Sequence, residues 1–362
     1  MVVAGARREE SAWEGSARCG TCAGTLVSLV PWRSDRACAG ACGRRLCYRC
    51  RGRFPLIRSA EALAACRCEE LCEGCFVRCS ALDFERACDV VVPPAGVAVR
   101  GVAVWAHGGG SHRLMFARHA ARLAERGWGA VLVDLPAHGA RRDEALTRAS
   151  LAAAVEQGAA AFPGDAALPR LYVGASLGAY LALPLLAAAP RGRWAAAALL
   201  DMGQNVGPDA SLAARLALSA MRASLHWFSN ETLMQQMAKL AAGAASDLDC
   251  ELVLETCFKG GQFFDRGAEI VDALRGVEPA KELPSIHMPL LFINGSADHR
   301  DSEQRWLALA PNKASQLLVY DQGDHFFMHS RRYFERTLDD IHRFFAEHVD
   351  PPRSSSTELM AI

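Results

Sequence analysis

The amino-acid sequence predicts an α/β fold, with a mostly parallel central sheet covered by helices on both faces and a small cysteine-rich domain in front of it. From about residue 88 onward, apolar runs alternate with alanine- and leucine-rich helical segments, and this alternation favours a parallel sheet. The 14 cysteines are unevenly placed, since 12 of them lie between Cys19 and Cys88. We therefore expect a module over residues 13–88 and a larger domain over residues 89–350.

Composition excludes some classes of function. The chain has 362 residues, 51% of them hydrophobic, which is enough for a large core. Lysine plus arginine and aspartate plus glutamate are balanced at 40 each, so no net charge attracts nucleic acid or an acidic membrane. The N-terminal residues lack the apolar run of a secretory signal, and no later stretch suits a membrane span. We expect a cytoplasmic protein without a nucleic-acid partner.

Cysteine pairs predict two structural zinc ions in the first module. In a reducing compartment, clustered cysteines bind metal more often than they form disulfides, and two thiolates on one tight turn supply half of a tetrahedral site. The eight expected ligands are Cys19 and Cys22, Cys38 and Cys42, Cys47 and Cys50, and Cys72 and Cys75. Cys66 could replace one of them, whereas Cys79 and Cys88 are expected to be small buried residues.

The order CGTC, ACAGACGRRLCYRC and LCEGCF, with Trp13 upstream, resembles the FYVE family of cross-brace zinc fingers. The resemblance implies that the first and third pairs share one ion and the second and fourth pairs the other. It departs from the family where the phosphoinositide reader should lie, since residues 34–38 read SDRAC and contain no histidine. We expect a structural or protein-contacting finger, with an endosomal membrane bearing phosphatidylinositol 3-phosphate as the alternative partner.

The stretch from Leu171 to Leu186 predicts a strand, a sharp turn and a helix that together present Ser176. The turn reads Gly-Ala-Ser-Leu-Gly, and a serine there is held at unfavourable backbone angles. Side chains at Gly174 and Gly178 would strike the neighbouring strand and helix. The pattern alone is weak, and its setting between a strand and a helix makes it specific.

Two loops before this turn contain glycines and histidines. Residues 97–107 form an expected strand that ends in HGGG, where backbone N–H groups of Gly109 or Gly110 could approach a developing oxyanion. Leu177, directly after the serine, should supply the second donor. His107 is expected to brace its loop.

The sequence HGGG, followed by DLPAHG and GASLG, is similar to the α/β-hydrolase superfamily, and most similar to its monoacylglycerol lipase and serine aminopeptidase-like branch. The resemblance covers roughly residues 88–348 and implies an α/β-hydrolase fold. It also implies that Asp134 and His138 brace loops near the site rather than react.

An acid and a base follow in the order that this superfamily uses. Asp298 lies after the strand ending at Gly295, and His325 lies after the next strand. Asp201 also stands at a strand end and is the alternative acid. His299 and His329 are the weaker alternatives to His325.

The remaining elements complete the larger domain. Residues 204–284 interrupt the core pattern with helical periodicity and are expected to form a cap over the site, whereas residues 351–362 form a polar tail expected to be disordered. Ordinary core packing is the expected role of one group of apolar side chains, with an apolar substrate pocket as the alternative. These are Met221, Met234, Met237, Trp227, Phe263 and Phe264. The other expected helices cover residues 116–127, 150–162 and 331–349, and the other expected strands lie within 88–96, 128–139, 194–200, 289–295 and 315–322.

These patterns predict a serine hydrolase of the carboxylesterase or lipase type, acting on a lipid or small acyl ester through an acyl-enzyme on Ser176. No organic cofactor is expected, and the zinc module would recruit a partner. The alternatives are a non-catalytic scaffold and a lipase brought to endosomal membrane by a phosphoinositide.

Overall fold

The computed structural model describes residues 87–164, 167–203, 207–208, 210–224, 267–298, 301–330 and 332–349. The chain divides into two compact units between Leu82 and Asp83, and the described residues belong to the second unit. The eight predicted zinc ligands, together with Trp13, Cys66 and Cys79, lie outside the described residues, as does the tail at 351–362. Cys88 is the first residue of a strand and packs, half-buried, against the core.

The predicted mostly parallel sheet is confirmed. Seven strands follow the order β1-β3-β2-β4-β5-β6-β7. The pairing of β1 with β3 is antiparallel, and the other five pairings are parallel. The strands are β1 Cys88–Val91, β2 Gly101–Ala106, β3 Trp128–Val133, β4 Arg170–Ala175, β5 Ala196–Leu200, β6 Leu290–Gly295 and β7 Gln316–Tyr320.

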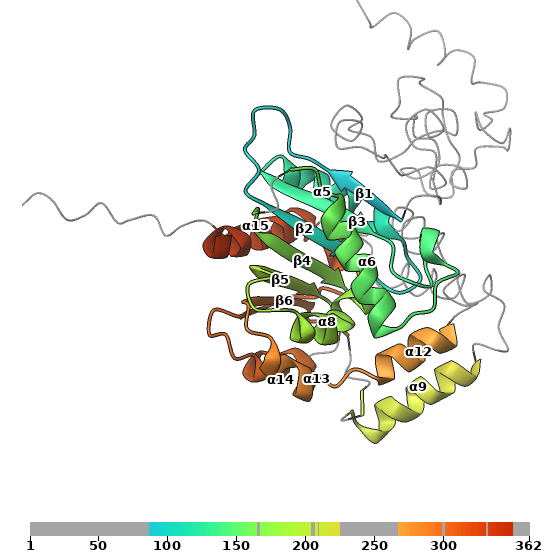
Figure 1. Ribbon diagram of the computed structural model, residues 1–362. Coiled ribbons are helices and arrows are strands. Elements are labelled where there is room, and N and C mark those ends of the chain that lie inside the picture. The colour runs from blue at the N-terminus through green and yellow to red at the C-terminus, as the bar shows by residue number, and fades with distance from the viewer. Residues whose placement is uncertain are drawn as a thin grey trace, which may run out of the picture. The chain divides into compact units, whose positions relative to one another are not determined.

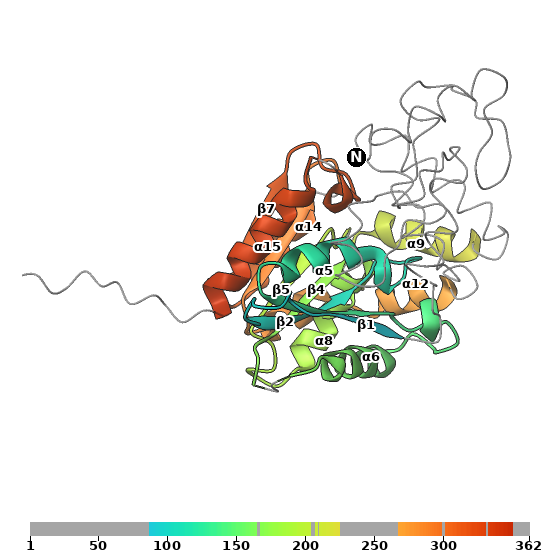
Figure 2. The same cartoon turned by 90° about the horizontal axis from the view of Figure 1, so that it is seen from above.

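Helices cover both faces of the sheet, as Figures 1 and 2 show. Helices α5 and α15 lie on one face, and α6 and α8 lie on the other. The strands β2, β3, β5 and β6 are buried along their whole length, as expected for a parallel sheet enclosed on both sides. The longer helices are α5 Ala117–Ala124, α6 Arg148–Ala161, α8 Ala182–Ala188, α9 Leu212–Ser224, α12 Gly267–Arg275, α14 Asp301–Leu309 and α15 Phe334–Val349.

The helix after Ser176 is divided, which differs from the single helix expected from the sequence. It consists of α7 Leu177–Tyr180 and α8, with Leu181 between them. Pro184 explains the break, because a proline has no N–H to donate to the carbonyl of Tyr180 and its ring crowds that carbonyl. The short helix α7 begins directly after Ser176 and so closes the turn that presents this serine.

Helices α9 and α12 lie side by side at one end of the sheet, within the segment predicted to be a cap (Figures 1 and 2). The guanidinium of Arg222 on α9 lies 2.9 Å from the carboxylate of Asp272 on α12. The carboxylate of Glu269 accepts a hydrogen bond from the N–H of Leu146, which connects α12 to the loop before α6. The role of this segment as a cap stays a prediction, and residues 225–266 lie outside the described part of the chain.

Helix α14 was not expected from the sequence. The indole of Trp306 is buried and meets the ring of Tyr180 on α7 edge-on. Leu307 and Leu309 also pack against the core, so the helix contacts it through its second half. Short helices complete the fold, namely η1 Arg113–Phe116, η2 Gly139–Arg141, α13 Pro279–Glu282, η3 Leu283–Ser285 and η4 Phe327–His329. In the described part of the chain, no helix combines the length and apolar character that crossing a membrane requires.

Candidate active site

Ser176 lies on the sharp turn between β4 and α7. Its backbone has φ 49° and ψ −114°, a conformation that costs free energy for a residue with a side chain. The N–H of Ser176 donates to the carbonyl of Leu200 on β5, at 2.9 Å, which fixes the turn to the neighbouring strand. The sequence prediction of a strand, a sharp turn and a helix agrees with this geometry.

The two glycines of the turn are required by close packing. A Cβ at Gly174 would lie 2.7 Å from the backbone of Gly178, and a Cβ at Gly178 would lie 2.5 Å from the carbonyl oxygen of Ala106. Both distances are far shorter than ordinary van der Waals contact. A side chain at Gly178 would push α7 away from the end of β2, and a side chain at Gly174 would push β4 and α7 apart, so either would displace Ser176.

His325 lies between Ser176 and Asp298. Its Nε2 is 3.0 Å from Oγ of the serine, and its Nδ1 is 2.8 Å from Oδ2 of the aspartate. The three residues come from three different loops, after β4, β6 and β7. Because the imidazole bridges a hydroxyl and a carboxylate, it can remove the proton from the hydroxyl while the carboxylate stabilises the resulting imidazolium.

Backbone contacts between two loops bring the aspartate and the histidine together. Gly295 packs directly against Gly323, since a Cβ added to Gly295 would lie 2.2 Å from the carbonyl oxygen of Gly323. The N–H of Ala297 donates to the same carbonyl at 2.8 Å, and Oγ of Ser296 accepts from the N–H of Gln322 at 2.7 Å. The loops after β6 and β7 therefore hold each other as one unit.

The electrostatic surroundings favour a protonated His325. Burial lowers the pKa of its imidazole, but the hydrogen bond to Asp298 and the neighbouring carboxylates outweigh burial, so the net shift of the pKa is upward. The imidazole is 36% exposed, compared with 11% for the Asp298 side chain. A reactant can thus reach the base from solvent, whereas the acid is largely enclosed.

Asp201, the alternative acid, does not contact the imidazole in the way that Asp298 does. It is fully buried at the end of β5, and its Oδ1 accepts from the N–H of Gly295 at 3.3 Å. One oxygen of Asp201, one oxygen of Asp298 and one nitrogen of His325 nevertheless lie within 4.8 Å of one another. Such a group could hold a cation, but both imidazole nitrogens already have hydrogen-bond partners in Asp298 and Ser176.

The alternative bases are not at the serine. His299 lies outside the described residues. His329 is buried, stacks on Phe116 and meets the ring of His119 edge-on. Of the described histidines, His325 is therefore the one that contacts Ser176.

The expected oxyanion donors fare differently. The N–H of Gly110 donates to Nε2 of His138 at 3.1 Å, which favours Gly109 over Gly110 as the oxyanion donor expected from this loop. Leu177 is the first residue of α7, so its N–H has no acceptor within the helix and is available to a ligand. The loop is close to the serine, since a Cβ at Gly108 would lie 3.4 Å from Cβ of Ser176.

His107, Asp134 and His138 brace loops, as the sequence predicts. Nε2 of His107 accepts from the N–H of Leu135 at 3.0 Å, and its Nδ1 lies 2.7 Å from the carbonyl of Gly108. Burial is the main cause that lowers the pKa of His107 far below its ordinary value, and burial also lowers the pKa of His138 to about 4. Both imidazoles are therefore neutral and act as hydrogen-bond acceptors for the backbone.

A buried ion network under these loops was missed by sequence reasoning. The guanidinium of Arg113 lies 2.8 Å from the carboxylate of Asp89 and 2.9 Å from that of Asp134, and all three side chains are at most 9% exposed. The carboxylate of Asp134 also accepts from the N–H of Ala140 at 2.9 Å. No local sequence pattern pairs these residues, because Arg113 is 24 residues from Asp89 and 21 residues from Asp134 along the chain.

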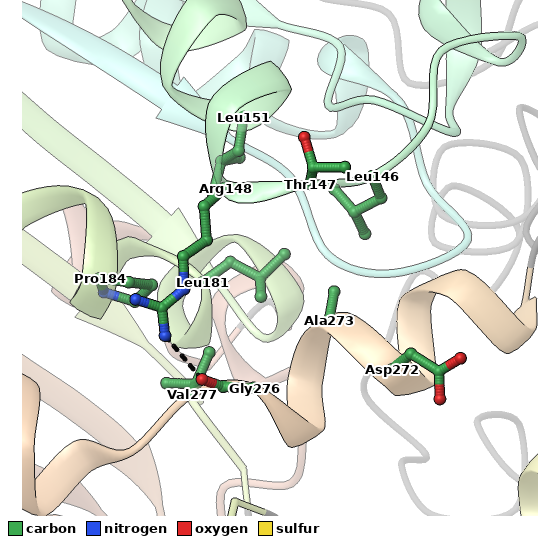
Figure 3. Close-up of a pocket in the computed structure, with 10 residues that line it drawn as sticks. All are labelled: Leu146, Thr147, Arg148, Leu151, Leu181, Pro184, Asp272, Ala273, Gly276 and Val277. Atoms are coloured by element: carbon green, nitrogen blue, oxygen red, sulfur yellow. Dashed lines mark hydrogen bonds between the residues drawn. The ribbon is translucent and has the colours of Figure 1, made fainter.

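A cavity of about 200 Å³ lies on the face of the sheet that α6 and α8 cover (Figure 3). The guanidinium of Arg148 crosses it and donates to the carbonyl of Gly276 at 2.7 Å. The other lining residues are Leu146, Thr147, Leu151, Leu181, Pro184, Asp272, Ala273 and Val277. None of the predicted site residues lines this cavity. The predicted pocket residues cannot be assigned to it either, since Met221 lies on α9 and the other five fall outside the described residues.

Comparison with known proteins agrees with this architecture. No curated protein matches the chain in sequence. MenH from S. aureus is 17% identical, with a TM-score of 0.56 over 73% of this chain and 99% of MenH. The esterase EaEST from Exiguobacterium antarcticum is 15% identical, with a TM-score of 0.54 over 71% of this chain and 94% of the esterase. A soluble variant of monoglyceride lipase from Saccharomyces cerevisiae is 13% identical, with a TM-score of 0.52 over 73% of this chain and 92% of the lipase.

At these identities the likeness to solved structures concerns the fold alone. The sequence model of the alpha/beta hydrolase family matches residues 103–337, which is more than half of the chain. The matched part contains the turn with Ser176 and the loops that carry Asp298 and His325. The chain therefore belongs to the alpha/beta hydrolase family.

Proposed function

We propose that this protein is a serine hydrolase that cleaves carboxylic esters through an acyl-enzyme on Ser176. The observation that carries the proposal is the continuous hydrogen-bond chain from Oγ of Ser176 through His325 to Asp298. A free serine hydroxyl is a weak nucleophile, and this arrangement supplies the base that activates it. Membership of the alpha/beta hydrolase family supports a hydrolytic reaction.

The proposed reaction has two stages. Oγ of Ser176 attacks the ester carbonyl carbon while its proton moves to Nε2 of His325, and the N–H groups of Gly109 and Leu177 stabilise the oxyanion. The imidazolium then gives this proton to the departing alkoxide, which leaves the acyl group on the serine. In the second stage, water transfers a proton to His325 as it attacks the acyl carbon, and the histidine returns a proton to Oγ as the carboxylic acid departs.

The proposed substrate is a lipid-like or small acyl ester. The structural neighbours include an esterase from Exiguobacterium antarcticum and a monoglyceride lipase from Saccharomyces cerevisiae. The partly exposed imidazole of His325 is compatible with a substrate that enters from solvent. A panel of p-nitrophenyl esters and monoacylglycerols of increasing acyl length would define the preferred chain, and we expect turnover of at least one of them.

Active-site labelling tests the nucleophile. A fluorophosphonate probe should label the full-length protein and should not label Ser176→Ala. The matched control is Ser219→Ala, which removes an exposed hydroxyl on α9 and should label like the unaltered protein. Labelling that persists in Ser176→Ala would overturn the assignment of the nucleophile.

A non-catalytic scaffold is the competing function. An intact chain of three hydrogen-bonded residues argues against it, because a protein that no longer catalyses has no need to keep the serine, the histidine and the aspartate in register. The absence of turnover with every ester in the panel, together with no probe labelling, would favour the scaffold.

We propose further that residues 13–88 bind two structural zinc ions through the eight paired cysteines and recruit a partner. The support is the spacing of the pairs, whose cysteines are separated by two or three intervening residues, which suits tetrahedral thiolate sites. Metal analysis of the purified full-length protein should find about two zinc ions per chain. Vesicles with and without phosphatidylinositol 3-phosphate would test the membrane alternative, and equal binding to both would remove it. We propose a cytoplasmic location, and fractionation of cells would test it.

A further inference from the structure

Asp201 has an unusual position for an aspartate outside the chain of three hydrogen-bonded residues. It follows β5, which lies between the strand leading to Ser176 and the strand leading to Asp298. Its φ is 44°, a backbone conformation that is uncommon for residues other than glycine. Its N–H donates to the carbonyl of Ile293 at 2.9 Å. The backbone therefore holds this carboxyl group at the junction of the three strands.

The Asp201 side chain is fully buried, yet its Oδ2 has no hydrogen-bond partner among the described residues. Its Oδ1 accepts one N–H, that of Gly295, at 3.3 Å. An ionised carboxylate in such surroundings would lack most of the hydrogen bonds that it has in water. An oxygen of Asp201 also lies within 4.8 Å of an oxygen of Asp298. Two negative charges at that distance in an enclosed site repel each other strongly.

We infer that Asp201 and Asp298 share a single proton at neutral pH, with Asp201 the protonated member and a positioning residue for the Asp298 carboxylate. The inference rests on the proposed function, in which Asp298 orients His325. One proton removes both problems at once, because a protonated Oδ2 becomes a donor and the neighbouring carboxylate is its acceptor.

The proton belongs on Asp201 rather than on Asp298. Asp298 accepts from the imidazole of His325 at 2.8 Å and is 11% exposed, and both features stabilise its ionised form. Asp201 has no exposure, and its Oδ2 makes no hydrogen bond with a described residue. The charged groups that face it are Asp298 and His325, from the loops after β6 and β7, and burial is the main cause that raises the pKa of Asp201 well above its ordinary value.

The consequence for the reaction concerns the charge on the base. Two ionised carboxylates beside His325 would stabilise its imidazolium and would reduce the fraction of neutral base available to accept the serine proton. A neutral Asp201 leaves one negative charge to orient the imidazole. Asp201 thus supports Asp298 with a hydrogen bond without adding a second charge.

Infrared spectroscopy of the unaltered protein is the first test. Ordinary aspartates and glutamates are ionised at neutral pH, so a protonated buried carboxyl gives a separate C=O absorption. We expect this absorption at neutral pH and its loss in Asp201→Asn. Its absence from the unaltered protein, or its persistence in Asp201→Asn, would overturn the inference, and neither measurement requires turnover.

Titration of His325 by NMR is the second test. Asp201→Asn replaces one neutral group by another, so the pKa of His325 should stay within about 0.3 of a unit of its original value. Had Asp201 been ionised, the loss of a close negative charge would lower that pKa by about one unit or more. The matched control is Asp324→Asn, which removes a partly exposed carboxylate that also faces His325 and should lower the pKa.

Turnover measurements on two Asp201 variants separate a positioning role of this residue from an effect of its charge. With a p-nitrophenyl ester, Asp201→Asn should keep kcat within a few-fold of the original, since the amide can donate to Asp298, whereas Asp201→Ala should lower kcat about tenfold or more. An equal loss in both variants would overturn the positioning role. Failure of Ser176 labelling would overturn the proposed function instead, and the infrared and NMR results would still decide where the proton lies.

Discussion

His107 and His138 each accept a backbone N–H from the loop that carries the other. His107 follows β2 and accepts from Leu135, whereas His138 follows β3 and accepts from Gly110. The two rings lie 4.9 Å apart, with their planes at 67°. The pair therefore fixes the glycine loop beside Ser176 to its neighbour without making contact with the serine.

Removing one half of this brace should impair turnover. In His138→Ala, the N–H of Gly110 loses its acceptor and the loop with Gly109 can shift, so we expect kcat with a p-nitrophenyl ester to fall on the order of tenfold to a hundredfold. His138→Gln keeps an oxygen acceptor and should recover part of the loss. The exposed His287→Ala is the control. An unchanged kcat in His138→Ala would show that the brace has no part in turnover.

The same histidine should make stability depend on pH. The imidazole of His138 has a pKa of about 4 in the folded protein, compared with about 6.5 in the unfolded chain. Between these values the unfolded chain binds the proton and the folded protein does not, so the free energy of unfolding decreases as the pH falls from about 6.5 to about 4. The contribution of His138 is about 3 kcal/mol.

Urea unfolding at several pH values would measure this effect, as the difference between the unaltered protein and His138→Gln. The variant should lose less stability over the same pH range, and His287→Gln should behave like the unaltered protein. A difference that stays constant from pH 4 to 7 would contradict the expectation.

The glycines beside the serine should tolerate no side chain. In Gly178→Ala, the new Cβ would lie 2.5 Å from the carbonyl oxygen of Ala106, and backbone atoms cannot move aside as a flexible side chain can. We expect a loss of roughly 1–3 kcal/mol in the free energy of unfolding, together with a loss of most activity. In the control Gly276→Ala, the nearest atom is 3.5 Å away, and stability should stay close to the original.

The pH profile of activity should reflect His325. Its pKa is shifted upward, and the imidazole must be neutral to accept the serine proton. We therefore expect kcat/KM to rise with pH, with a midpoint above the ordinary value of about 6.5. Asp298→Asn removes the hydrogen-bonded negative charge and should move this midpoint downward as well as lower kcat. A midpoint at or below 6.5 in the unaltered protein would contradict the expected direction of the shift.

Much of the fold was predictable because its signals are local. Buried strands and amphipathic helices alternate along the chain, and strand ends are marked by glycine, histidine and aspartate. Helix α14 escaped prediction because its first five residues are polar and its apolar residues Trp306, Leu307 and Leu309 occupy little more than one turn, too short a stretch to show periodicity. The break between α7 and α8 could have been predicted from Pro184, because the effect of proline on a helix depends on nearby residues only.

The sequence by itself determined which residues are candidates for the site: a serine flanked by two glycines, then an aspartate and a histidine at the ends of later strands. Only the tertiary structure decided how they combine. It brought Ser176, His325 and Asp298 within hydrogen-bond distance, committed the N–H of Gly110 to His138, and placed Asp201 beside Asp298. The reason is physical: a strand or turn depends on neighbouring residues, whereas a distance between side chains from separate loops depends on how the whole sheet is ordered and packed.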